Sequence, residues 1–406
     1  MHLDIITELL ELQNYKAAMV IKTEESINVI LERIKDTPPV CSGCGKVHGT
    51  STHSSDVVTV EDLRIFNKRV SLTVPKRKVR CVEDNTIRVE EIPWLRGRVT
   101  DRFAEQVYRL TSITTNQEAG WFLGLDDEKV YRIDKSKLEE LALERLNPTP
   151  MPKKMSVDEV AWQKWHKYVT NVVDIDQRKV IWNHNGRGKV TLDKFFRSLG
   201  KEDRENIEAV ACDGAKGYLS SIKQYAVNAL IVLDHFHVKK YLNDAVDTVR
   251  KEELKKARQQ QNGELSEILH CNKRFILMQN TVTRKKQNLL ERLSSLNEKV
   301  YQAMLLKEQF VAIYKDHKTA HRSLKEWIVA AIRSNIPAFV ALGKKFFRKR
   351  HYVLNYFRHQ ITTAISEGIN NKIKRLSRMA YGYKNVSYFL LKIHQHCGLL
   401  NPRFAT

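Results

Sequence analysis

The chain has 406 residues, 42% of them hydrophobic and 29% charged, a balance that supports packed cores and excludes wholesale disorder. Its 69 Lys and Arg residues exceed its 47 Asp and Glu residues by 22, which favours a protein that holds a polyanion over an enzyme of small metabolites. We expect neither a membrane span nor a signal peptide, because no apolar run approaches roughly 18 residues and no basic segment leads an apolar one at the N-terminus. Six cysteines are too few for a disulfide scaffold and favour a reducing cytoplasm.

Three small modules are predicted in the first part of the chain. Residues 1–36 look helical. Residues 37–96 are expected to form a zinc-ribbon-like domain, because apolar residues alternate in DVVTVEDLRI and KRVSLTVPKRKVRC with the period of strands. Residues 97–146 should be helical again. The proline-rich segment 147–154 is the predicted linker to the rest of the chain.

Cysteines stand at both ends of the strand-like region. Cys41 and Cys44 form a Cys-x-x-Cys turn of the kind that clamps a zinc ion between thiolates. Cys81 lies where a zinc ribbon would place its second pair of cysteines. The second cysteine of that pair would stand at position 84, but this chain has Asp84 there. The candidates for the fourth ligand are Asp84, His48 and His53. We predict a structural zinc ion, with a ribbon that folds without metal as the alternative.

The segment 113–139 has helix-turn-helix spacing. A first helix should end at the turn Gly124-Leu125-Asp126, and a second should begin near Asp127. The small shared core should consist of Ala119, Leu123, Val130 and Ile133. The second helix of such a pair enters the major groove of DNA, whereas an ordinary helical hairpin has no such role. The predicted DNA contacts on this helix are Lys129, Tyr131, Arg132 and Lys135.

After the linker the pattern changes to an α/β domain. Residues 155–237 predict a meander of three strands, a short helix, and then strand, helix and strand. This is the order of a ribonuclease H-like core, in which acidic residues on the first and fourth strands meet near the sheet centre. Residues 238–355 predict a large all-helical insertion, and residues 356–406 should return to the core. Two helices are expected there, over 361–380 and near 386–397.

Two aspartates fall on the central strands of this predicted core. Asp158 lies in the first strand, flanked by Val157 and Val160, and Asp213 ends the fourth strand after an apolar run. Open α/β sheets place their sites at such strand ends, although a single aspartate there is often only a turn residue. Paired carboxylates repel each other unless a cation lies between them, so the two together favour a metal site.

Glu367 supplies a third carboxylate. Residues 341–384 contain 11 Lys and Arg residues and this one acid. The apolar face of its helix consists of Ile365, Ile369, Ile373, Leu376 and Ala380, and its polar face carries Glu367, Asn370 and Asn371. A glutamate that only stabilises a helix N-terminus is the alternative.

An Asp–Asp–Glu set suits divalent cations such as Mg²⁺ or Mn²⁺, which assist in-line displacement at phosphorus. Asp234 and His237 are three residues apart, and the chemistry leaves three roles open for them. They are metal ligands, a pair that supports the ligands, or the start of a helix that Asp234 caps. Basic side chains near these groups would follow a phosphate backbone. The candidates are Lys345, Arg350, Lys374, Arg375 and Arg378.

The order of these motifs, from about residue 40 to 396, resembles the ISL-three family of bacterial insertion-sequence transposases. The most specific segments are DHFHVKK and EGINNKIKRLSRMAYGYKN. The resemblance implies a ribonuclease H-like fold with Asp158, Asp213 and Glu367 as the catalytic set, and Asp234 and His237 in support. It also implies excision and integration of a DNA element through its terminal inverted repeats, with a divalent metal.

Further expectations concern partners and rival functions. Joining two DNA ends to target DNA favours a homodimer on double-stranded DNA, associated with the nucleoid in the cytoplasm. The rival is a DNA-binding regulator, or a decayed transposase that binds ends without cutting; the presence of all three acids argues against decay. A junction resolvase would share the core but has no need of two N-terminal DNA-reading modules.

Overall fold

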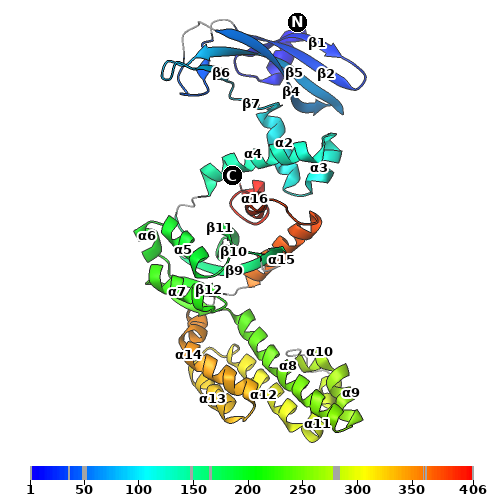
Figure 1. The fold of residues 1–406 in the computed structure, drawn as a ribbon, viewed down its shortest axis with the longest axis vertical. Coiled ribbons are helices and arrows are strands. Elements are labelled where there is room, and N and C mark those ends of the chain that lie inside the picture. Colours follow the sequence, from blue (N-terminus) through cyan, green and yellow to red (C-terminus); the bar gives the residue numbers. More distant parts are fainter. Residues whose placement is uncertain are drawn as a thin grey trace. The chain divides into compact units, whose positions relative to one another are not determined.

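The computed structural model describes residues 2–34, 37–47, 53–146, 150–163, 167–277, 284–359, 361 and 364–404. The chain forms two compact units (Figure 1). The N-terminal unit consists of Met1–Glu144 with Leu400–Thr406, and the core unit of Arg145–Leu399. Within the described ranges, no helix has the length and apolar character that crossing a bilayer requires.

The N-terminal unit is built on one twisted sheet and the helix α1 (His2–Leu10). Its main strands run in the order β1-β2-β5-β4-β8-β7, and β6 pairs with both β5 and β3. The strands are β1 (Tyr15–Lys22), β2 (Ser26–Arg33), β3 (Val40–Cys41), β4 (Ser54–Ile65), β5 (Lys68–Arg80), β6 (Ile87–Glu91), β7 (Leu95–Arg96) and β8 (Val99–Thr100).

The predicted helical character of residues 1–36 is wrong beyond α1. Strands β1 and β2 pair with each other, and β2 continues in parallel onto β5. Tyr15 and Ala17 are buried on either side of the exposed Lys16, and Val29 and Leu31 are buried in β2, so apolar burial follows a period of two. Pairing with strands that come later in the chain therefore overrides the local preference for a helix.

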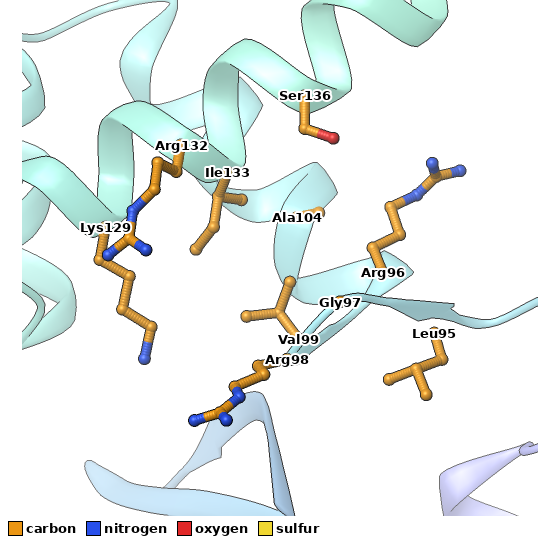
Figure 2. A pocket seen from close by; sticks show the side chains of 10 residues that line it. All are labelled: Leu95, Arg96, Gly97, Arg98, Val99, Ala104, Lys129, Arg132, Ile133 and Ser136. Carbon is orange, nitrogen blue, oxygen red and sulfur yellow. The ribbon is translucent and has the colours of Figure 1, made fainter. Parts of the chain in front are cut away.

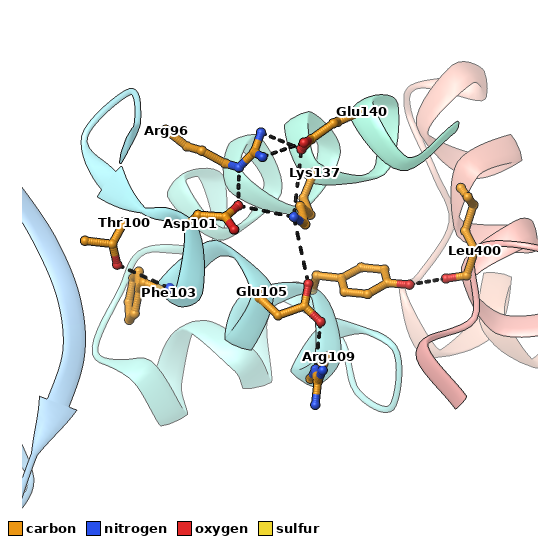
Figure 3. A network of polar contacts seen from close by, with 10 residues as sticks. Arg96, Thr100, Asp101, Phe103, Glu105, Arg109, Lys137, Glu140 and Leu400 are labelled. Carbon is orange, nitrogen blue, oxygen red and sulfur yellow. Dashed lines mark hydrogen bonds and ion pairs between the residues drawn. The ribbon is translucent and has the colours of Figure 1, made fainter. Parts of the chain in front are cut away.

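The helices predicted over 97–146 are confirmed as α2 (Asp101–Thr111), α3 (Asn116–Leu123) and α4 (Asp127–Arg145). Thr115 and Glu118 form a capping box at the start of α3. Gly124 ends α3 with a φ of 65°, a left-handed conformation that favours glycine. The shared core contains Ala119, Leu123 and Val130, as expected. The final segment of the chain joins this unit, since the Tyr108 hydroxyl donates to the Leu400 carbonyl (Figure 3).

The core unit contains a five-stranded sheet in the order β11-β10-β9-β12-β13. The first three strands along the chain form the predicted antiparallel meander, and β12 and β13 run parallel to β9. These strands are β9 (Lys154–Gln163), β10 (Lys167–Asp174), β11 (Lys179–Asn185), β12 (Ala209–Cys212) and β13 (Leu230–Leu233). The helices of this part are α5 (Lys189–Ser198), α6 (Lys201–Glu205) and α7 (Lys216–Tyr225).

Helices cover both faces of this sheet. Met155 and Val157 of β9 pack with α5 and α7, whereas Val160 and Trp162 of the same strand pack with α15 (Ala364–Met379) and α16 (Val386–Cys397). Because successive side chains of a strand alternate between faces, Asp158 lies on the α15 face. Both of these helices match the ranges predicted for the C-terminal part.

The segment predicted as a helical insertion contains, within the described residues, seven helices around one apolar core. They are α8 (His235–Gln259), α9 (Gly263–Cys271), α10 (Lys273–Leu277), α11 (Arg284–Leu296), α12 (Glu298–Ile313), α13 (Ala320–Arg333) and α14 (Pro337–His359). The first, α8, begins directly after β13. The last, α14, returns to that strand, where the Asn355 side chain donates to the Ile231 carbonyl at 2.9 Å. The two ends of the insertion are therefore held at the same edge strand.

Candidate active site and zinc centre

Three aspartates occupy one row across neighbouring strands. The β9–β12 ladder pairs Ser156 with Ala211, so two residues further along, Asp158 lies level with Asp213. The β12–β13 ladder pairs Cys212 with Leu233, so the next residues, Asp213 and Asp234, are also level. Asp213 is on the strand beside β9 and Asp234 one strand further away, as the predicted strand order requires. Since neighbouring strands lie about 4.8 Å apart, the row brings the three acids close together where β12 and β13 end.

The charges of this row act on one another. Burial raises the pKa of Asp158; the hydrogen bond from the Glu159 amide and the charge of His237 oppose this rise, and the charges of Asp234 and Asp213 add to it. Burial alone would lower the pKa of His237, but its 2.7 Å contact with Asp234 and the charges of the other two acids raise it. Asp234 also caps α8, accepting from the Phe236 amide at 2.8 Å. Asp234 and His237 thus form a hydrogen-bonded pair beside Asp158 and Asp213.

Glu367 lies in the exposed first turn of α15, and its neighbours attach that turn to β9. The Asn370 amide donates to the Asp158 carboxylate at 2.6 Å, and the Ser366 hydroxyl shares a buried hydrogen bond with Ser156. Asn370, predicted on the polar face of this helix, is 8% exposed and faces β9. The structure therefore brings the helix of Glu367 to Asp158, and no hydrogen bond joins the Glu367 carboxylate to the other acids among the described residues.

Two side chains of the insertion hold the turn that follows β12. The Tyr241 hydroxyl of α8 donates to the Asp213 carbonyl at 3.1 Å, and the Lys349 ammonium of α14 donates to the Gly214 carbonyl. Gly214 has a φ of 77°, and a Cβ there would meet Leu233 at 2.6 Å. Lys349 stands at a non-helical break in α14. The sequence did not predict Tyr241 or Lys349 as part of the site, and it predicted Asn370 only as a member of the polar face of its helix.

The cations predicted near the acids occupy different environments. The Lys345 ammonium lies 3.1 Å from the centroid of the Tyr241 ring, and burial, together with the charge of Lys349, lowers its pKa to about 8. Arg350 is exposed and donates to the Phe347 carbonyl at 2.9 Å. The remaining three predicted contacts are exposed on α15. They are Lys374, Arg375 and Arg378.

The predicted cysteines form a compact cluster. The sulfur atoms of Cys41, Cys44 and Cys81 all lie within 4.8 Å of one another, and in the described part of the chain no other set of three potential metal ligands is as close. The Gly43 amide points to the Cys41 sulfur at 3.4 Å, and Lys46 bridges to Glu83 at 2.5 Å, which joins the two cysteine-bearing turns. This thiolate set fits a zinc ion.

The fourth ligand remains a prediction. Asp84 is not part of the compact set of three sulfurs, but its side chain interacts with that of Cys81, and its carboxylate accepts from Arg88 at 2.6 Å and from the Thr86 hydroxyl at 2.7 Å. These hydrogen bonds, with that of Thr86 first, lower its pKa. His53 is exposed and also outside the cluster. His48 lies outside the described residues.

On α4 the predicted DNA contacts lie on two sides of the helix. Lys129 pairs with Glu61 of β4 at 2.7 Å, and Arg132 is exposed one turn later. Lys135 lies 5.9 Å from the centroid of the Tyr131 ring. The buried side carries Val130, Asp134 and Leu138, and the exposed residues of the helix also include the acids Asp127, Glu128 and Glu139.

Comparisons with known proteins cover most of the chain. A family model described as a transposase matches residues 155–393, and one described as the zinc-finger of transposase IS204/IS1001/IS1096/IS1165 matches residues 37–84. The chain is 32% identical over 361 residues, 87% of each protein, to the transposase for insertion sequence element IS1001 of Bordetella parapertussis. It is 26% identical over 255 residues, 57% of each protein, to the transposase for insertion sequence element IS1557 of Mycobacterium tuberculosis. Both similarities agree with the resemblance found in the motifs.

Proposed function

Because this chain belongs to the ISL-three family of insertion-sequence transposases, we propose that it binds the terminal inverted repeats of its element and catalyses cleavage and strand transfer of DNA. The strand order and the helices on both sheet faces support a ribonuclease H-like core. The lengths and caps of α3 and α4 support a helix-turn-helix module whose second helix reads DNA.

The observation that carries this proposal is the row of acids with α15 attached to it. Asp158 and Asp213 are level on adjacent strands, and Asn370 ties the helix of Glu367 to Asp158. We assign Asp158, Asp213 and Glu367 as the catalytic set, with Asp234 and His237 holding the geometry and charge of the row.

The donor chemistry of this set fits divalent cations. Carboxylate oxygens are the ligands that Mg²⁺ and Mn²⁺ prefer, and a cation would offset both the burial of the Asp158 carboxylate, which is the main cause of its raised pKa, and its repulsion by Asp234 and Asp213. The three acids of the catalytic set would hold the ions. When bound, such ions activate the attacking oxygen and stabilise the leaving oxygen in phosphoryl transfer. The chain itself keeps the acids level through the two strand ladders and attaches the helix of Glu367 to β9 through Ser366 and Asn370.

The remaining partners follow from the reaction. Two element ends and a target duplex must meet, so we propose a homodimer that assembles on DNA in the cytoplasm, at the nucleoid. The zinc-bound ribbon and α4 would select the ends, and the cations of α14 and α15 would hold the phosphates near the acids.

We expect the purified protein to nick a supercoiled plasmid at cloned element ends when Mg²⁺ or Mn²⁺ is added, and not in EDTA. The ends are identified as imperfect inverted repeats flanking the open reading frame. Mapping the nicks by primer extension separates end cleavage from contaminating nuclease, because a plasmid without the ends should stay intact. Specific binding of ends without metal-dependent cutting would instead support the rival function, a DNA-binding regulator.

Loss of the hydrogen bonds that hold the turn after β12 should slow cleavage without weakening DNA binding. Lys349→Met removes the donor to Gly214, and we expect about a 10- to 100-fold slower single-turnover cleavage, the range seen when a group that orients a metal ligand is lost. Tyr241→Phe removes only one hydroxyl and should have a smaller effect in the same direction. Lys325→Met is the matched control, because it removes the same charge from an exposed lysine of α13 that has no place in the site. Equal rates for the two methionine variants at saturating protein would contradict the positioning role.

A further inference from the structure

The N-terminal unit contains a groove beside the predicted recognition helix, and two of the predicted DNA contacts, Lys129 and Arg132, line it. It has a volume of about 760 Å³ and lies between the turn that joins β7 to β8 and one side of α4 (Figure 2). Arg98 stands on the turn, and Lys129, Arg132 and Ser136 reach the groove from the helix, one or two turns apart. The turn itself was not singled out by any sequence motif.

The groove combines a cationic rim with an apolar floor. Four of the ten residues that line it are Arg or Lys, and none is acidic. The floor contains Val99 and Ala104, 4% and 1% exposed. Arginine recognises phosphate through its planar fork of donors, and an apolar floor suits the deoxyribose ring that lies between two phosphates. The lining therefore matches a sugar-phosphate backbone.

Two of the four cations are already neutralised and two are not. Arg96 forms ion pairs with Asp101 and Glu140 (Figure 3), and Lys129 pairs with Glu61 at 2.7 Å. Arg98 and Arg132 are exposed and, within the described part of the chain, meet no acid; the Arg132 Nε lies 3.5 Å from a helix carbonyl. The paired cations shape the groove, and in Figure 2 Arg132 reaches it from α4 and Arg98 from the turn.

The turn is fixed before any ligand binds. The Glu61 amide of β4 donates to the Arg98 carbonyl at 3.0 Å, and Gly97 adopts the left-handed φ of 59° that the tight turn needs. On the far side, Thr100 caps α2 and donates to the buried Asp62 at 2.7 Å. A ligand held by this turn would not have to order it first, which preserves affinity.

We propose that this groove binds the phosphodiester backbone of duplex DNA, with Arg98 and Arg132 holding one phosphate from two sides. The inference rests on the proposed function in so far as the DNA belongs to an element end. It adds a sequence-independent contact, made by a β-turn, to the base contacts expected of α4.

The test measures binding of the full-length protein to a 30-base-pair duplex of unrelated sequence over a series of KCl concentrations. Arg98→Gln and Arg132→Gln should each weaken binding about tenfold and make log K depend less steeply on log salt, and the double variant should reduce that slope by about 0.9, the value for one phosphate contact. The double variant should lose less than the product of the two, because both side chains hold the same phosphate. Arg109→Gln, which removes an exposed arginine of α2 that is paired with Glu105, is the control and should keep the wild-type slope.

Three results would overturn the proposal for the groove, and each can be told apart from a failure of the proposed transposase function. The inference is overturned if Arg98→Gln binds like Arg109→Gln, or if it changes only the preference for ends over unrelated DNA, which would make Arg98 a base reader. A changed sedimentation coefficient with unchanged DNA binding would make the groove a protein interface and would also overturn it. Failure of the transposase proposal would show as absent end cleavage by the wild type and leaves this test intact, since the duplex carries no element sequence.

Discussion

Asp158→Asn should abolish DNA cleavage while leaving DNA binding unchanged. The substitution keeps the size and hydrogen-bonding capacity of the side chain, including an acceptor for the Asn370 amide, but removes an anionic ligand from the row of acids. Loss of such a ligand costs several kcal/mol of transition-state stabilisation, so we expect single-turnover cleavage in Mg²⁺ to fall by at least about a thousandfold. Glu367→Gln should behave in the same way, because it is assigned to the same ions.

The matched control is Asp176→Asn, which removes an exposed acid from the turn after β10 of the same sheet. It should cleave like the wild type. Binding of all variants to element ends is measured by gel shift without divalent metal. A variant that binds ends normally but does not cleave them is then distinguished from one that has failed to fold. Cleavage by Asp158→Asn at more than a tenth of the wild-type rate would contradict its role.

Cys44→Ser should release the zinc ion and weaken specific end binding. The three sulfurs are the closest set of potential ligands in the described chain, and removal of one thiolate leaves two. We expect about one zinc per chain in the wild type and none in the variant by elemental analysis. Because the two cysteine-bearing turns carry β3 and connect β5 to β6, the variant should also unfold at a lower temperature.

Cys271→Ser is the control for this experiment, since Cys271 is an exposed cysteine of the helical insertion, far along the chain from the cluster. It should keep zinc, thermal stability and end binding. Freshly purified protein that has met no chelator and still contains no zinc would refute the zinc centre outright.

The parts of the fold that the sequence predicted have strong local signals. Helix α4 begins at Asp127 as expected, because the glycine at 124 ends the preceding helix in a left-handed conformation. Helices α15 and α16 were placed within a few residues by their apolar period of 3.6. The same local reasoning failed at β1 and β2, whose apolar residues are stabilised as strands only by pairing with β5.

The acids of the site were predictable, whereas the groups that hold them were not. Asp158 and Asp213 stand out because a carboxylate in a buried strand is unusual. Asn370 meets Asp158 across 212 residues of sequence, and Lys349 meets Gly214 across 135, with no spacing rule that connects either pair. The hydrogen bond from Tyr108 to Leu400, within the N-terminal unit, is another contact between residues far apart in the sequence that no spacing rule predicts.

The identity of the second acid tests the whole assignment most directly. Asp213 and Asp234 are level on adjacent strands, but only the strand of Asp213 pairs with that of Asp158. The measurement compares single-turnover end cleavage by Asp213→Asn and Asp234→Asn in Mg²⁺ and Mn²⁺, with folding and end binding checked for both. We predict that Asp213→Asn binds ends normally and does not cut, and that Asp234→Asn loses folding or active-site geometry rather than metal binding alone. The opposite result would contradict the account. In that result Asp213→Asn still cuts the ends, whereas Asp234→Asn folds and binds the ends normally but does not cut them.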